Sequence, residues 1–239
     1  KKNNDYNAKG SLNFSILSNN QKIKELMQNI SNSKILNNNI EIKGDATSNF
    51  SINLDKTLKV LNYNIDINCE IDKSKIKFNN EIKNSFFKKN IKNISLKKSN
   101  LKINLNNEKN NFFFIDGSYS VNNSEYQKFN ITNNFNKKNS NFILDLYIKE
   151  NISIPLINYE KNNSKIAKIK TKLIFTANEI KISEFLYTEA KNSMKIVNLV
   201  LNKNLQIRKI QELKLNTFKN NLENNNFKIK FGSKIIVNG

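Results

Sequence analysis

The stretch YNIDINCEI, residues 63–71, decides the fold because apolar and polar side chains alternate along its whole length. One parity carries an aromatic, a cysteine and three isoleucines, and the other carries only Asn, Asp and Glu. A period of two places these two sets on opposite faces of an extended chain. The stretch therefore predicts a β-strand with one apolar face and one wet face.

The same alternation extends in both directions from this stretch. Further apolar runs of this kind lie at residues 12–16, 40–54, 76–78, 94–96, 101–105, 113–121, 129–135, 142–148, 169–175, 180–182, 194–201, 213–215 and 227–231. Asn-rich connectors such as residues 106–111 and 220–226 separate the runs, and Asn tolerates the left-handed backbone of tight turns. Short strands without crossover helices between them predict a mostly β fold, an antiparallel meander.

One segment departs from this pattern. Ile23, Leu26, Met27 and Ile30 have the i, i+3, i+4, i+7 spacing of an amphipathic helix, and Asn20 suits its N-cap. We expect one short helix near residues 20–31 that packs on the sheet. The chain is then a single segment over residues 1–239, with a helix-containing N-terminal part (1–60) and repeat-like strands (61–239).

The composition is strongly basic. Lys and Arg number 40 against 20 Asp and Glu, a formal charge of +20. Such an excess is typical of proteins that bind nucleic acid or anionic membranes. Here Lys rises together with Asn, Ile and Phe, while His and Trp are absent, which indicates an A/T-rich coding sequence. The aromatic residues mostly share parity with Ile and Leu, away from the lysines, so no nucleic-acid partner is expected.

Residues for catalysis are scarce. The chain has no His, and its five glycines are scattered, so neither a His-based triad nor a phosphate-binding glycine loop can form. Asp66, Glu70 and Asp72 share the outward parity of one strand, where a solvated face is the favoured interpretation. Cys69 lies on the apolar parity and is expected to be a buried hydrophobe. We predict that the protein is not an enzyme and has no catalytic residues, cofactor or metal site.

Two stretches resemble a known family. Residues 144–161 read LDLYIKENISIPLINYEK, an alternating strand followed by an Ile-Pro step and then by an aromatic and Lys. Residues 177–217 read ANEIKISEFLYTEAKNSMKIVNLVLNKNLQIRKIQELKLNT, successive strands with basic, Asn-rich turns. This rhythm is similar to that of the AsmA-like proteins, which include the TamB-like and YhdP-like envelope proteins of Gram-negative bacteria. The resemblance covers about the last half of the chain.

This resemblance implies an elongated meander that curls into an open apolar groove in the periplasm, anchored to the inner membrane by a segment upstream of this chain. The groove would bind and conduct phospholipid acyl chains between the inner and outer membranes, with outer-membrane or other envelope proteins as further partners. The candidate groove residues are Phe50, Ile52, Tyr63, Ile65, Ile67, Phe113, Ile115, Phe142, Leu144, Leu146, Leu173, Phe175, Ile196 and Leu199.

Periodicity alone does not decide whether the apolar face is open or covered. A second sheet that covers it would make the chain a structural β-sandwich or adhesin-like module without lipid cargo. Closure of the sheet on itself would also bury or enclose this face. A basic nucleic-acid-binding protein is the further alternative, and a steep salt dependence of DNA affinity would be its signature.

Overall fold

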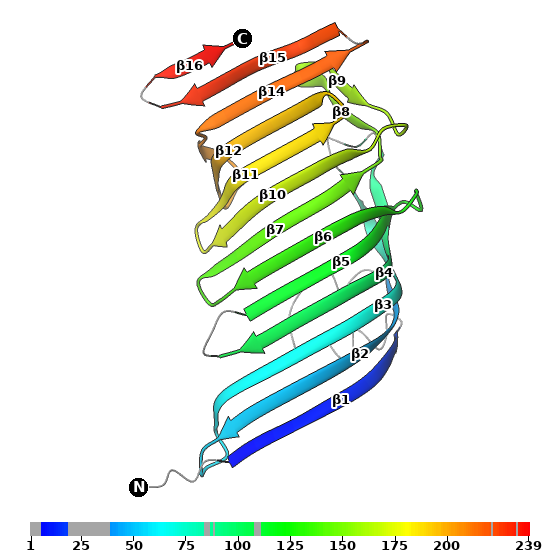
Figure 1. Ribbon diagram of the computed structural model, residues 1–239, viewed down its shortest axis with the longest axis vertical. Coiled ribbons are helices and arrows are strands. Elements are labelled where there is room, and N and C mark those ends of the chain that lie inside the picture. Colours follow the sequence, from blue (N-terminus) through cyan, green and yellow to red (C-terminus); the bar gives the residue numbers. More distant parts are fainter. Residues whose placement is uncertain are drawn as a thin grey trace. The chain divides into compact units, whose positions relative to one another are not determined.

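The computed structural model describes residues 6–18, 39–83, 87, 89–107, 111–220, 222–232 and 234–239 (Figure 1). The helix expected near residues 20–31 lies outside the described residues. Most described residues are in strands, and neighbouring strands pair antiparallel in the order β1-β2-β3-β4-β5-β6-β7-β10-β11-β12-β14-β15-β16, with β13 beside β12. The predicted antiparallel meander is confirmed. The chain divides into two compact units, which we describe separately.

Unit 1 comprises residues 1–81, 92–123 and 132–136. Its strands are β1 (Tyr6–Ser18), β2 (Asn39–Leu54), β3 (Val60–Ile82), β4 (Ile91–Asn106) and β5 (Asn111–Val121). Ala46, Cys69 and Ile71 are buried at the centre of its apolar face, with Leu101 and Ile115 packed against them. Cys69 is a free, buried thiol, as expected, and burial raises its pKa, with the charges of Asp45 and Glu70 adding to the effect.

Two of the β-bulges in unit 1 change the parity of its apolar residues. Between Ile71, which pairs with Gly44, and Lys73, which pairs with Lys43, Asp72 is an extra residue. The apolar parity of β3 therefore changes from odd numbers before the bulge to even numbers after it. The runs at 63–71 and 76–78 belong to one strand, and Gly44 lies inside β2. A second bulge, in β4 between Lys97 and Asn100, joins the runs at 94–96 and 101–105 in the same way.

Unit 2 comprises residues 82–91, 124–131 and 137–239, so that β6 (Gln127–Phe135) is divided between the two units. Its sheet contains β7 (Asn139–Ile148), β10 (Ala167–Thr176), β11 (Glu179–Glu189), β12 (Asn192–Asn202), β13 (Ile207–Lys209), β14 (Glu212–Lys219), β15 (Leu222–Phe231) and β16 (Ile235–Asn238). Ser183 is an extra residue of β11 in its pairing with β10, since Lys172 pairs with Glu184 and Leu173 pairs with Ile182. The apolar residues change parity at this point in β11 and, around Asn198, in β12. The left-handed backbone of Asn198 (φ 50°) accommodates this irregularity.

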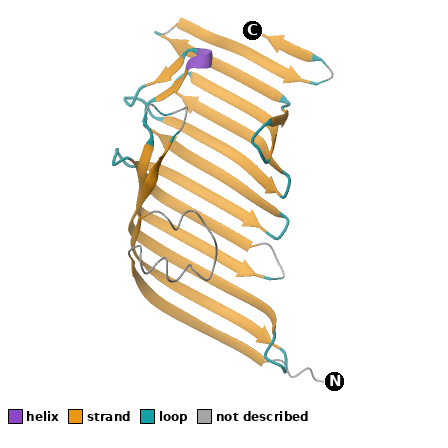
Figure 2. Cartoon of the chain, turned by 180° about the vertical axis from the view of Figure 1, so that it is seen from behind, coloured by secondary structure: helices purple, strands orange, loops and turns teal. Residues whose placement is uncertain are grey.

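Residues 152–161 leave the sheet of unit 2 and form a separate hairpin, which we call the flap. It consists of β8 (Ile152–Ile154), the 3₁₀ turn η2 (Pro155–Ile157) and β9 (Tyr159–Lys161). Pro155 fixes the first position of the turn, and Asn158 ends it in the left-handed conformation while its N–H donates to Pro155 O at 3.0 Å. Figure 2 shows the turn as the short purple helix at the tip of the flap.

Candidate functional site

The largest continuous feature of unit 2 is the apolar face of its sheet. The strand register arranges its side chains in rows that cross the strands. One row is Phe142, Leu173, Ile182 and Leu199, and the next is Leu144, Thr171, Phe185, Ile196, Leu213 and Ile229. The rings of Phe142 and Phe175 meet edge to face with centroids 5.4 Å apart. These rows form one hydrocarbon surface on the sheet.

Unit 1 has an apolar face of the same kind. Ile52 pairs with Tyr63, and Phe50 pairs with Ile65. On β4 and β5, the pairs are Leu101 with Ile115 and Ile103 with Phe113. The structure therefore places Phe50, Ile52, Tyr63 and Ile65 together, as the alternation predicted.

All fourteen candidate groove residues remain partly accessible. None of them is buried, and Phe175 is 36% exposed. A large apolar side chain inside a closed core is normally buried completely. Within the described part of each unit, the apolar face is therefore half-covered by its own neighbours and is not sealed by a second sheet.

The flap covers one end of the apolar face of unit 2. Ile152 and Tyr159 of the flap form a buried cluster with Ile148, Ala167 and Tyr187 of the sheet. Leu146, a candidate groove residue, packs against this cluster. A small cavity of about 10 Å³, roughly the size of one water molecule, lies under the flap beside Met194 and Leu215. The hydrocarbon surface ends here in a closed wall.

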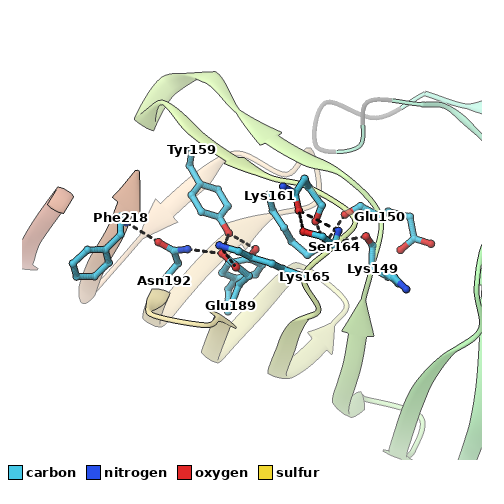
Figure 3. Close-up of polar contacts among 11 residues, drawn as sticks. Lys149, Glu150, Tyr159, Lys161, Ser164, Lys165, Glu189, Asn192 and Phe218 are labelled. Carbon is cyan, nitrogen blue, oxygen red and sulfur yellow. Dashed lines mark hydrogen bonds and ion pairs between the residues drawn. The ribbon is translucent and has the colours of Figure 1, made fainter. Parts of the chain in front are cut away.

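A buried carboxylate fastens the flap to the sheet (Figure 3). Glu189, at the end of β11, is 2% exposed, and its Oε2 accepts hydrogen bonds from Tyr159 Oη at 3.0 Å and from Asn192 Nδ2. Its Oε1 lies 3.3 Å from the ammonium of Lys165. Tyr159 Oη also lies 2.6 Å from Tyr187 Oη. Tyr159 is thus held by two polar groups of β11.

Asn192 extends this network to the next strand. While its Nδ2 donates to Glu189, its Oδ1 accepts from the backbone N–H of Phe218 at 2.6 Å. At the tip of the flap, Ile157 O accepts a hydrogen bond from Asn225 Nδ2 of β15 at 2.8 Å. Polar contacts therefore hold the flap at both its base and its tip.

Lys161 closes the base of the flap. Its side chain is 2% exposed, and its ammonium donates to three backbone carbonyls, those of Lys149, Glu150 and Asn162, at 2.8–3.2 Å. Burial lowers the pKa of Lys161, and the charges of Glu150 and Glu189 oppose this shift. An ammonium enclosed by carbonyl oxygens has no room for a substrate, so we interpret Lys161 as a structural residue.

The buried tyrosines Tyr159 and Tyr187 predict that unit 2 loses stability at alkaline pH. Burial raises the pKa of Tyr187 to about 12, and burial, followed by the Tyr187 hydrogen bond, also raises that of Tyr159. Raised folded-state values stabilise the fold below the unfolded pKa of 10.0, and this stabilisation is lost as pH rises through about 12. For Tyr187 alone, we expect a loss of about 3 kcal/mol in the free energy of unfolding. Urea unfolding followed by circular dichroism, at about pH 10 and about pH 12, measures this loss.

Two Tyr→Phe variants provide the control for this prediction. Tyr187→Phe is expected to lose much less stability between the two pH values, because the titrating hydroxyl is gone. The exposed Tyr126 serves as the matched position, and Tyr126→Phe should behave like the parent chain. An equal alkaline loss in Tyr187→Phe and in the parent would contradict the prediction.

The three acidic residues of β3 that the sequence analysis named have different surroundings. Asn64 and Asn104 both donate to Asp66, the first at 2.7 Å and the second at 2.5 Å. Glu70 lies opposite Asp45 on the neighbouring strand, and Asp72 occupies the bulge. Among the described residues, no group of three His, Cys, Asp or Glu side chains suits a metal ion. No helix in the described part of the chain is long and apolar enough to cross a membrane.

Lysines and aromatic rings share the wet face at two places, contrary to the general expectation from parity. The ammonium of Lys168 lies 4.6 Å from the ring centroid of Tyr147 and donates to its hydroxyl at 2.9 Å. Lys102 pairs with Phe114 across β4 and β5. Lys168 also forms an ion pair with Asp145 at 3.2 Å. This acidic partner disfavours a phosphate at the same position.

The flap network was not predicted from the sequence, although one signal for it is present. Glu189 has the same parity as Phe185 and Tyr187, so a carboxylate stands on the apolar face of β11. Such a residue needs a buried polar partner, and Tyr159, Lys165 and Asn192 provide it. Comparisons with protein-family models, with curated proteins and with solved structures find no match to this chain.

Proposed function

We propose that the apolar sheet faces of this protein bind the acyl chains of lipids. The observation that supports this most directly is the partial exposure of all fourteen candidate residues on the face of each sheet. Burial of hydrocarbon contributes about 0.8 kcal/mol per CH₂ group, so one long acyl chain gains on the order of 10 kcal/mol on leaving water. An aliphatic and aromatic surface can recover much of this free energy.

The composition of the face favours loose binding along its length. The row of Phe142, Leu173, Ile182 and Leu199 contains no charged side chain, and Leu144 and Ile196 belong to the next row. A chain of CH₂ groups therefore meets similar neighbours at successive positions and can slide between them. The headgroup would remain in water at the margin of the sheet, and the formal charge of +20 would attract anionic lipids.

The resemblance to AsmA-like proteins agrees with this function, and membership of that family stays a prediction. Under it, the cargo is phospholipid, the compartment is the periplasm, and the chain is a segment of a protein anchored in the inner membrane. The closed wall beneath the flap adds a specific element, because acyl chains on unit 2 would stop at Tyr187 and Met194.

Paired lysine substitutions on adjacent residues test the proposal. Leu144 lies on the apolar face of β7, whereas its neighbour Ile143 lies on the opposite face and is 49% exposed. We expect Leu144→Lys to reduce bound acyl chains several-fold, since an ammonium would lie in the hydrocarbon surface, and Ile143→Lys to leave binding unchanged. Ile67→Lys and Asn68→Lys form the equivalent pair in unit 1, where Asn68 is exposed.

The measurement is native mass spectrometry of protein prepared without detergent, with titration of a fluorescent fatty acid as a second readout. Circular dichroism establishes that each variant retains its strands. Lipid-free parent protein that also fails to bind the fatty acid would overturn the proposal. Equal loss of binding in Leu144→Lys and Ile143→Lys would show that the effect comes from charge or unfolding and not from the apolar face.

A further inference from the structure

Three lysines stand in one line across the wet face of the unit 2 sheet. Lys195 on β12 pairs with Lys214 on β14, and Lys214 in turn pairs with Lys228 on β15. These strands are neighbours in the sheet (Figure 1). Leu213 and Leu215, on either side of Lys214 in the sequence, lie on the apolar face, so the three lysines lie on the opposite face. We call these three residues the lysine row.

The lysine row is unfavourable for the sheet on its own. Like charges directly opposite each other on neighbouring strands destabilise a sheet, because their side chains lie close together. The two outer lysines have acidic partners, since Lys195 lies 3.7 Å from Glu184 and Lys228 lies 3.1 Å from Glu212. Lys214, between them, is exposed, and within the described part of the chain its ammonium forms no ion pair or hydrogen bond. Its charge is therefore available to an anion outside the chain.

Lys230 adds a further positive charge beside the row. It lies two residues beyond Lys228 on the same face of β15, and it stands opposite Glu212, the carboxylate that already pairs with Lys228. Four lysines on three adjacent strands therefore share two carboxylates. We propose that this patch of the wet face binds the surface of an anionic lipid membrane. The inference does not depend on acyl-chain binding, because acyl chains are proposed to lie on the other face of the sheet.

Lateral mobility of the anions favours a membrane over a nucleic acid. Anionic headgroups can gather at Lys214 while they avoid the two carboxylates, whereas the phosphates of a DNA duplex have a fixed spacing and would meet the carboxylates too. On β12 and β14, the row is flanked on the wet face by Ser193, Val197, Glu212 and Asn216. None of these residues is aromatic, so base stacking has no ring beside the row on these two strands.

Replacement of the row by neutral side chains tests the proposal. The probe is a vesicle of equimolar phosphatidylglycerol and phosphatidylcholine, and binding is measured by co-sedimentation at about 0.1 M salt. We expect the parent to bind these vesicles but not vesicles of phosphatidylcholine alone. The combined variant Lys195→Gln, Lys214→Gln, Lys228→Gln should lose about a hundredfold in affinity, because each lysine near an anionic surface contributes about a fivefold gain.

A second triple variant removes the same formal charge elsewhere in unit 2. Lys137, Lys191 and Lys203 lie in connections between strands and are exposed, so Lys137→Gln, Lys191→Gln, Lys203→Gln is the matched control. Its affinity should fall less than about tenfold, because these charges lie outside the patch and are screened from the contact by salt. Binding of the fluorescent fatty acid should stay unchanged in both triple variants, which separates membrane binding from acyl-chain binding.

Lys214→Glu separates membrane binding from stability. A carboxylate between Lys195 and Lys228 replaces repulsion by attraction, so the urea midpoint of unfolding should rise at low salt, and this rise should shrink at high salt. The same change should weaken vesicle binding about thirtyfold, because it removes one positive charge and adds a negative one. A purely structural role of Lys214 would not produce opposite signs in the two assays.

Failure of the parent to bind the anionic vesicles, or equal losses of affinity in both triple variants, would overturn the proposal. Unchanged vesicle binding by Lys214→Glu, or a lower urea midpoint for this variant, would do so as well. Tighter binding of a DNA duplex than of the vesicles, weakened by the row variant, would assign the lysine row to nucleic acid instead.

Discussion

Gly44→Ala is expected to destabilise unit 1 by about 3 kcal/mol, the upper end of the usual cost of overpacking. A Cβ atom at this position would lie 2.2 Å from the backbone oxygen of Glu70 and 3.0 Å from Cα of Ile71. Both are backbone atoms of β3 beside the bulge, so the strand itself would have to move. Urea unfolding followed by circular dichroism, with hydrogen exchange of peptides from β2 and β3, measures the effect.

Gly232→Ala is the matched control for this prediction. A Cβ at Gly232 would find its nearest atom at 3.8 Å, which is ordinary van der Waals contact. We expect this variant to unfold within about 0.5 kcal/mol of the parent, as surface substitutions usually do. An equally small loss of stability in Gly44→Ala would contradict the close approach of β2 and β3 at the bulge.

The bulges explain how far the sequence predicts the fold. Alternation correctly identified the long strands of the sheet, but each bulge changes the apolar parity. A parity change in the sequence looks like the end of one strand and the start of another. The runs at 63–71 and 76–78 are both in β3, and those at 94–96 and 101–105 are both in β4. Gly44 and Gly117 lie opposite these two bulges.

The flap could not be predicted from periodicity, for a different reason. Its strands have three residues each, too short to show a period of two, and its position depends on contacts with distant strands. The sequence does contain the parts, namely Pro155 after an alternating strand and a carboxylate on the apolar parity of β11. Which strand provides the partner of this carboxylate depends on the tertiary structure, since Tyr159 and Glu189 lie 30 residues apart.

Loss of the buried carboxylate is expected to release the flap. Glu189→Ala removes the acceptor for Tyr159 Oη and Asn192 Nδ2 and leaves both donors buried without it. Each such donor costs about 1–3 kcal/mol, so we expect unit 2 to lose roughly 2–4 kcal/mol. Hydrogen exchange should increase most in residues 152–161, since the sheet keeps its own backbone hydrogen bonds.

Glu184→Ala is the matched control on the same strand. The Glu184 side chain is 43% exposed and forms an ion pair with Lys195 at 3.7 Å, and an exposed pair of this kind contributes about 0–1 kcal/mol. Glu189→Gln separates the hydrogen bonds from the charge, because the amide can still accept from Tyr159 while the attraction to Lys165 is lost. We therefore expect its stability to lie between those of Glu184→Ala and Glu189→Ala.

The same variants connect the flap to the proposed acyl-chain binding. Release of the flap would uncover Tyr187, Met194 and Leu215, which lie on the same face as the open rows. Glu189→Ala should then bind more fluorescent fatty acid than the parent, whereas Glu184→Ala should not. Faster exchange of the flap without added binding would mean that the apolar face beneath it is only a packing surface. Unchanged exchange would show that Glu189 does not fasten the flap.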